Sequence, residues 1–296
     1  MQDDSYQWNN LLPYLERSFN FTPPDTSKRL QNATTDYNSG VFNDKDQGPI
    51  EVSYTNFVTP FATWMKASME AVGIKVTRDF SSGHLLGTQY SPSTISPNDE
   101  SRSSSESFIR LHQGMKTLQV YTETLARKIF FNANKEATGV EVDSGGKTYK
   151  IHASKEVIAS AGAFQSPQVL MVSGIGPAEI LDKFNIPVLS DLPGVGQNMW
   201  DHVYFGPSYR VNLETATRLL HDPAYLAVLT AEYTTERTGP LANAPEVLGW
   251  EKVPDSLRSN FTNNTLRDLS NFATDWPELE VCLPYLHSYD SQLTSD

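Results

Sequence analysis

The sequence predicts a mixed fold of helices and strands, α/β in class and α+β overall. A short apolar run at 156–163 is typical of a strand buried on both faces, as in a parallel sheet. Short β-prone runs between 118 and 153 predict further strands, and an amphipathic stretch at 60–73 predicts a helix. The chain has 296 residues, of which 39% are hydrophobic, so it is large enough for two modest packed domains.

Charge and hydropathy exclude two classes of function. The chain carries 35 acidic and 23 basic residues and a net charge of −12, so it would repel a phosphate backbone and no nucleic-acid partner is expected. A membrane span needs an apolar run of about 18 residues, which the sequence lacks. A globular protein without a membrane span is therefore expected.

The compartment is left open by the sequence. The single cysteine, Cys282, forms no intrachain disulfide and favours a reducing compartment. The N-terminal stretch 1–10 is polar and acidic and is not a signal peptide. Four N-glycosylation sequons favour the secretory pathway for a full-length parent: Asn20, Asn32, Asn260 and Asn263.

The first third of the chain is predicted to contain one helix between two irregular segments. Segments 25–48 and 91–107 are rich in Asn, Asp, Ser and Thr and are expected to be extended and at the surface. Thr59 is expected to cap the helix, with Pro60 at its first position and Gly73 at its end. Its apolar stripe is interpreted as a core face.

Four β-prone runs follow, at 118–121, 128–131, 139–142 and 149–153. The turn-rich link 143–147 joins the last two and predicts a β-hairpin. Gly146-Lys147-Thr148 is not the end of a phosphate-binding loop, because Glu141 stands where that motif needs a glycine.

A strand, a turn of small residues and a helix are predicted over 156–174. Ser166 is expected to cap the helix, with Pro167 at its first position and Gly174 at its end. In doubly wound folds ligands bind at the carboxyl end of such a strand, and a helix N-terminus favours an anionic group. Packing alone is the alternative interpretation. A helix over 177–184 and a strand over 187–192 are predicted next, and the chain contains no complete Gly-x-Gly-x-x-Gly fingerprint.

The stretch 162–176 resembles the second signature of the glucose–methanol–choline (GMC) oxidoreductases. Its sequence, Gly-Ala-Phe-Gln-Ser-Pro-Gln-Val-Leu-Met-Val-Ser-Gly-Ile-Gly, matches that signature at every defined position. Nearly the whole chain is similar to this family, in particular its fungal aryl-alcohol-oxidase-like and secondary-metabolite members. Other matching segments are Trp8 with 12–14, 102–104, 137–140, 155–158, 192–198, 201–202 and 238–241.

The resemblance implies a partial FAD-binding, doubly wound domain and part of an antiparallel-sheet substrate domain. Residues 1–40 would form an extended connecting segment and 108–205 the FAD-domain part. Residues 41–107 and 206–296 would form substrate-domain parts, including a strand over 278–285. The family's ADP-binding fingerprint would precede residue 1 and its catalytic histidine would follow residue 296. The chain is therefore expected to be a central fragment, inactive by itself and poorly soluble.

Site residues follow from the resemblance by position. Ala126 would contact FAD through its backbone, although many members have valine there. Ala161 and Gly162 would lie near the flavin, and Asp201 and His202 would support it. His202 as a catalytic base is the alternative, but adjacent residues of a strand point to opposite faces and make poor partners. No catalytic residue is assigned, and no metal is expected, because no two histidines have ligand spacing.

The function implied is FAD-dependent oxidation of a small alcohol, by hydride transfer to the flavin, in fungal secondary metabolism. Two alternatives remain open. One is a flavin-independent, cyclase-type relative that keeps the fold. The other is a non-catalytic remnant.

Overall fold

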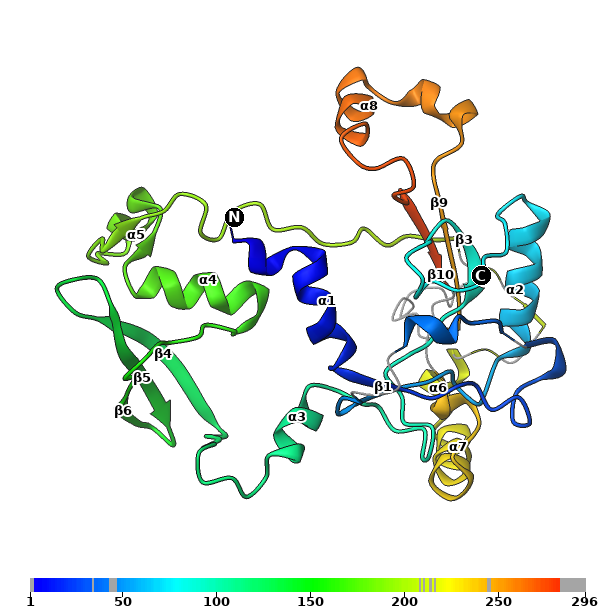
Figure 1. The fold of residues 1–296 in the computed structure, drawn as a ribbon, viewed down its shortest axis with the longest axis horizontal. Helices are drawn as coiled ribbons and strands as arrows, with labels where there is room; N and C mark the ends of the chain where they lie inside the picture. Colours follow the sequence, from blue (N-terminus) through cyan, green and yellow to red (C-terminus); the bar gives the residue numbers. More distant parts are fainter. Residues whose placement is uncertain are drawn as a thin grey trace. The chain divides into compact units, whose positions relative to one another are not determined.

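The computed structural model describes residues 3–33, 35–42, 47–207, 209, 211–212, 215, 217–243 and 246–282. The chain forms two compact units, a first unit of Met1–Gly114 with Val211–Asp296 and a second unit of Met115–Arg210 (Figure 1). Both contain helices and strands, which confirms the predicted α/β fold class.

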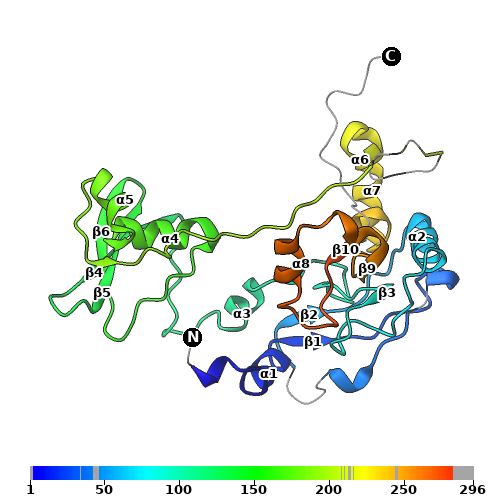
Figure 2. The same ribbon diagram turned by 90° about the horizontal axis from the view of Figure 1, so that it is seen from above.

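The first unit is built around an antiparallel sheet of three strands, in the order β10 (Leu279–Cys282), β9 (Val247–Glu251) and β3 (Gly87–Tyr90). A parallel pair, β1 and β2, lies beside it (Figure 2). Its helices are α1 (Trp8–Glu16), α2 (Pro60–Ala71), α3 (Glu106–Leu111), α6 (Thr217–His221), α7 (Pro223–Glu236) and α8 (Asn263–Leu269). Its strands are β1 (Phe19–Phe21), β2 (Ile50–Val52), β3 (Gly87–Tyr90), β9 (Val247–Glu251) and β10 (Leu279–Cys282).

Helix α2 packs on one face of this sheet. The Thr88 hydroxyl donates a hydrogen bond to Met69 Sδ over 3.1 Å. A Cβ at Gly249, in the central strand, would lie only 2.8 Å from the same sulfur, so a larger residue there would force the Met69 side chain to shift. The predicted start of α2 is confirmed, since Pro60 is its first residue and Thr59 Oγ1 accepts the Ala62 N–H.

The prediction that segments 25–48 and 91–107 lie at the surface is wrong in part. Arg29, Ile95 and Glu100 are buried, and the ring of Phe21 stacks on Phe42 at 3.7 Å. The segments are irregular, as predicted, but some of their side chains are part of the core of the first unit. The predicted strand 278–285 is present as β10, and residues 283–285 lie outside the described residues.

The second unit contains a three-stranded antiparallel sheet, β4-β5-β6, with α4 beside it (Figure 1). The elements are β4 (Thr124–Phe131), β5 (Ala137–Ser144), β6 (Lys147–His152), α4 (Gly162–Val172), β7 (Ile175–Gly176), α5 (Ala178–Lys183) and β8 (Ser190–Asp191). The predicted hairpin is confirmed, with Ser144 paired to Lys147 and Gly145 and Gly146 both at positive φ in the turn.

Two of the strands predicted in this unit are absent and a third is shorter than predicted. Segments 118–121 and 156–163 are not strands, and Ile158 is 76% exposed. An apolar run becomes a strand only where neighbouring strands accept its hydrogen bonds, and the described residues supply none here. The strand predicted over 187–192 is reduced to β8, which pairs in parallel with β7.

The predicted start of the next helix is also wrong. Helix α4 begins at Gly162, and Pro167 lies inside it. Ser166 therefore does not cap it from outside. Its hydroxyl reaches back to accept the Ala161 N–H, which satisfies the amide just before the helix.

The second unit is expected to make this chain aggregate in isolation. Its buried hydrophobic side chains, among the described residues, are Ile129, Val142 and Leu181. Its exposed ones are Met115, Leu118, Val120, Tyr121, Leu125, Tyr149, Ile158, Phe164, Phe184, Val188, Leu192, Met199, Trp200, Val203, Tyr204, Phe205 and Tyr209. Exposed apolar surface on this scale drives association. Light scattering after size exclusion tests this expectation, and a monodisperse monomer with a cooperative melt would contradict it.

Candidate cofactor site

Helix α4 is the centre of the candidate site, and contacts at two places hold it. The Ser173 hydroxyl donates to Val169 O (2.5 Å) and accepts the Ile129 N–H (2.9 Å), which ties the end of the helix to β4. The second contact joins α4 to β7. A Cβ at Gly176 would lie 2.8 Å from Met171 Cγ, so a larger residue at 176 would force the Met171 side chain to shift. The glycines of the family-like signature thus have a local packing reason.

Ala161 and Gly162 form the solvent-exposed N-terminus of α4. Both are exposed, and Gly162 has a φ of +91°, a backbone conformation that favours glycine. A Cβ at Gly162 would meet only Gln165 Oε1, at 3.6 Å. The helix start therefore presents small, accessible backbone groups at its positive dipole end.

Ala126 lies on β4, opposite Val142 of β5 and next to a register shift between Ala126 and Lys128. It is exposed, so its backbone and methyl group are accessible. A bulge of this kind turns one backbone group out of the regular ladder. This position suits a backbone contact, the role that the resemblance implies for it.

Asp201 and His202 lie in an exposed segment without regular structure. Asp201 Oδ1 accepts the backbone N–H of His202 over 2.8 Å. The carboxylate thus bonds to the main chain of His202, not to its ring, which does not form the Asp–His arrangement of a catalytic base. Within the described part of the chain, the structure shows no hydrogen bond between the three places, Ala126, Ala161–Gly162 and Asp201–His202.

Two features of these residues are compatible with FAD. Small exposed residues allow the close approach of a flat ring, and the N-terminal end of α4 favours an anionic group. The family resemblance implies that Ala126 would contact FAD through its backbone and that Ala161 and Gly162 would lie near the flavin. In the described part of the chain, no group of three His, Cys, Asp or Glu side chains could hold a metal ion, and no helix is long and apolar enough to cross a membrane.

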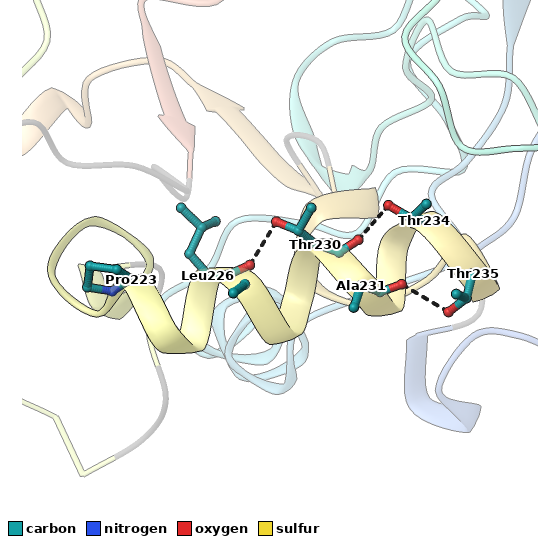
Figure 3. A pocket seen from close by; sticks show the side chains of 7 residues that line it. Pro223, Leu226, Thr230, Ala231, Thr234 and Thr235 are labelled. Carbon is teal, nitrogen blue, oxygen red and sulfur yellow. Dashed lines mark hydrogen bonds between the residues drawn. The ribbon is translucent and has the colours of Figure 1, made fainter.

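A separate apolar hollow lies along the exposed face of α7 in the first unit (Figure 3). Its threonine hydroxyls bond back to the helix, with Thr230 donating to Leu226 O (2.8 Å) and Thr234 to Thr230 O (2.7 Å). The face therefore presents mainly methyl groups, and its chemistry suits packing rather than recognition of a polar ligand.

Sequence reasoning missed a network of buried charges in the first unit. Glu246 accepts hydrogen bonds from Thr59 N and Thr59 Oγ1, both at 2.9 Å, and from the Asn243 side chain. Glu100 accepts from the backbone and side chain of Asn56, at 3.1 and 2.6 Å. Burial raises the pKa of both carboxyl groups. These bonds fix the start of α2 and the irregular segments around it.

Arg29 is the buried cation of the same network. Its Nε donates to Ala33 O over 3.1 Å and its Nη1 donates to Thr55 O. The guanidinium carbon lies 5.2 Å from the centre of the Tyr90 ring, within the range of a cation–π contact. Burial lowers the pKa of Arg29 and raises that of Tyr54 to about 12. Since the two carboxylates lie far from Arg29 in sequence, no local pattern identifies the network.

Comparison with known proteins finds similarity over most of this chain. The profile of the GMC oxidoreductase family matches residues 4–204. Patulin synthase of Aspergillus clavatus is 43% identical over 94% of this chain, which spans 44% of that protein. An FAD-dependent oxidoreductase from Chaetomium thermophilum is 27% identical with a TM-score of 0.72, over 85% of this chain and 45% of that one. A fungal aryl-alcohol oxidase shares the fold, with a TM-score of 0.74, 22% identity, and coverage of 93% and 48%.

Proposed function

The chain belongs to the GMC oxidoreductase family, whose cofactor is FAD, and on that premise we propose that it contributes to an enzyme oxidising a small alcohol. Fungal secondary metabolism is the proposed setting, since 94% of this chain is similar to a part of patulin synthase. The chain spans less than half of that relative, so the activity of the whole enzyme is part of the proposal.

The observation that carries the proposal is the open start of α4. Ala161 and Gly162 expose backbone at the N-terminal end of a helix that Ser173 and Met171 hold in place. Such a helix start favours an anionic group and lets a cofactor approach the backbone closely. When bound there, FAD supplies the acceptor for the hydride that leaves the alcohol carbon. Ala126 would add a backbone contact, and Asp201 and His202 would support the cofactor from the neighbouring segment.

The two units are proposed to have different roles. The second unit, Met115–Arg210, nearly coincides with the FAD-domain part expected at 108–205. The antiparallel sheet β10-β9-β3 of the first unit supports its assignment to the substrate domain. In this proposal the second unit binds the cofactor and the first contributes to substrate recognition.

The visible absorbance spectrum of the purified chain, before and after addition of FAD, tests the proposal. In the part of the sample that stays monomeric, we expect flavin absorbance to elute with the protein on gel filtration. The variant Ala161→Val should lose it, because the added methyl groups occupy the space beside the helix start. Ala161 is exposed just before the helix, so the added methyl groups do not enter the core.

Ala133→Val is the matched control, since Ala133 is exposed in the connection between β4 and β5, outside the proposed site. It should bind FAD like the parent chain. Equal binding by Ala161→Val would refute this placement of the cofactor. A folded chain with no flavin at all would instead favour a flavin-independent role.

A further inference from the structure

A projecting arm joins β9 to β10 in the first unit (Figure 1). It comprises residues 252–278 and contains a 3₁₀-helix, η5 (Asp255–Asn260), and α8. The base of the arm is fixed by Glu278, whose carboxylate accepts from Arg258 Nη2 (2.7 Å) and from Val253 N (3.0 Å). These bonds fix the position of the arm where it leaves the sheet. Most side chains of the arm are exposed.

Two of the four sequons lie on this arm, at its outer surface. Asn260 is the last residue of η5 and is exposed, and Phe261 after it is extended, with φ −79° and ψ 142°. Thr262 completes the sequon and caps α8 by accepting the Thr265 N–H over 3.1 Å. The exposed side chain of Asn260 and the extended backbone that follows it leave the acceptor amide accessible.

The other two sequons are less accessible in the fold. Asn20 lies within β1, paired with Glu51 of β2, and is only half-exposed. Asn32 is exposed, but the next residue of its sequon, Ala33, is fully buried. A bulky glycan would start within the β1–β2 pair at Asn20 and directly beside a core residue at Asn32.

We propose that Asn260 is the principal N-glycan acceptor of this chain when it passes through the secretory pathway. In the transfer, Asn260 Nδ2 forms a bond to the anomeric carbon of an oligosaccharide carried on a lipid pyrophosphate. The bond from that carbon to the pyrophosphate oxygen breaks, the amide nitrogen loses one proton, and the lipid pyrophosphate leaves with the bonding electrons. One glycan is expected on the arm, at Asn260 and not at Asn263, because the whole sequon 263–265 lies within the first turn of α8 whereas the backbone after Asn260 is extended.

The glycan would also cover exposed apolar surface. Side chains three residues apart eclipse one another in a 3₁₀-helix, so Asn260 lies over Leu257, which is 57% exposed. The first sugar residues at Asn260 would therefore shield this leucine from solvent. This placement gives the modification a role in solubility that does not depend on the proposed function.

The test is to express the full chain behind a yeast secretion leader and map the glycans by mass spectrometry. Peptides are treated with peptide N-glycosidase in heavy-oxygen water, and both secreted and cell-retained protein are analysed. We expect most of the label at Asn260 and little at Asn20. Asn260→Gln should remove the main mobility shift on a gel, and Asn20→Gln should leave it.

Two controls separate the modification from the fold. Asn264→Gln changes a neighbouring exposed asparagine that is not an acceptor and should leave the shift intact. Thr262→Ser keeps both the sequon and the cap of α8, whereas Thr262→Ala removes both. An unmodified Asn260, or a dominant label at Asn20 or Asn32, would overturn the proposal.

Discussion

Replacing Gly174 with alanine is expected to destabilise the second unit by about 2–4 kcal/mol. Gly174 has a φ of +90°, and an added Cβ would lie 2.6 Å from Pro187 O. The backbone has little room to shift, because Gly174 O accepts the N–H groups of Leu189 (2.8 Å) and Ser190 (3.1 Å). Hydrogen exchange of peptides covering α4 and β4 measures the effect, with protection expected to fall about 30-fold or more.

Gly194→Ala is the matched control for this substitution. No atom lies within 4 Å of a Cβ built at Gly194, and its φ is not in the left-handed region. Its effect is expected to stay within about 0.5 kcal/mol. Equal losses of protection in the two variants would show that the close approach at Gly174 is not what stabilises this turn.

Replacing Glu246 with alanine is expected to destabilise the first unit by about 2–4 kcal/mol. The substitution leaves Thr59 N, Thr59 Oγ1 and the Asn243 side chain without this acceptor in a buried place. Because Thr59 caps α2, the loss should appear first in that helix. Hydrogen exchange of the amides of 62–71 measures it, and unchanged protection would contradict the expectation.

Measuring the unfolding free energy of Glu246→Gln at several pH values separates the effect of the Glu246 charge from the effect of its hydrogen bonds. Burial raises the pKa of Glu246 in the folded state, so ionisation of this group opposes folding. The stability that the protonated Glu246 carboxyl gives to the folded state is fully present below the usual pKa of a glutamate. This stability is lost as the pH rises through the folded-state pKa of Glu246. Relative to the parent chain, Glu246→Gln should therefore become more stable as the pH rises through that range. A constant difference between the two chains would rule out this titration.

Local chemistry made several elements predictable. Thr59 and Pro60 begin α2 through a side-chain cap and a preset φ, and Gly145 and Gly146 supply the positive φ that the hairpin turn needs. Each of these signals acts within a few residues. The same holds for the signature at 162–176, whose order of residues is by itself enough to indicate the family.

Sequence alone thus determined the family, the hairpin and the start of α2, because neighbours in the chain decide those features. Only the tertiary structure decided whether an apolar run became a strand and which polar residues became core. Segment 156–163 lacks the neighbouring strands that its hydrogen bonds require, within the described part of the chain. Arg29, Glu100 and Glu246 come from distant polar segments, and they are buried because each finds its partners only when the chain folds.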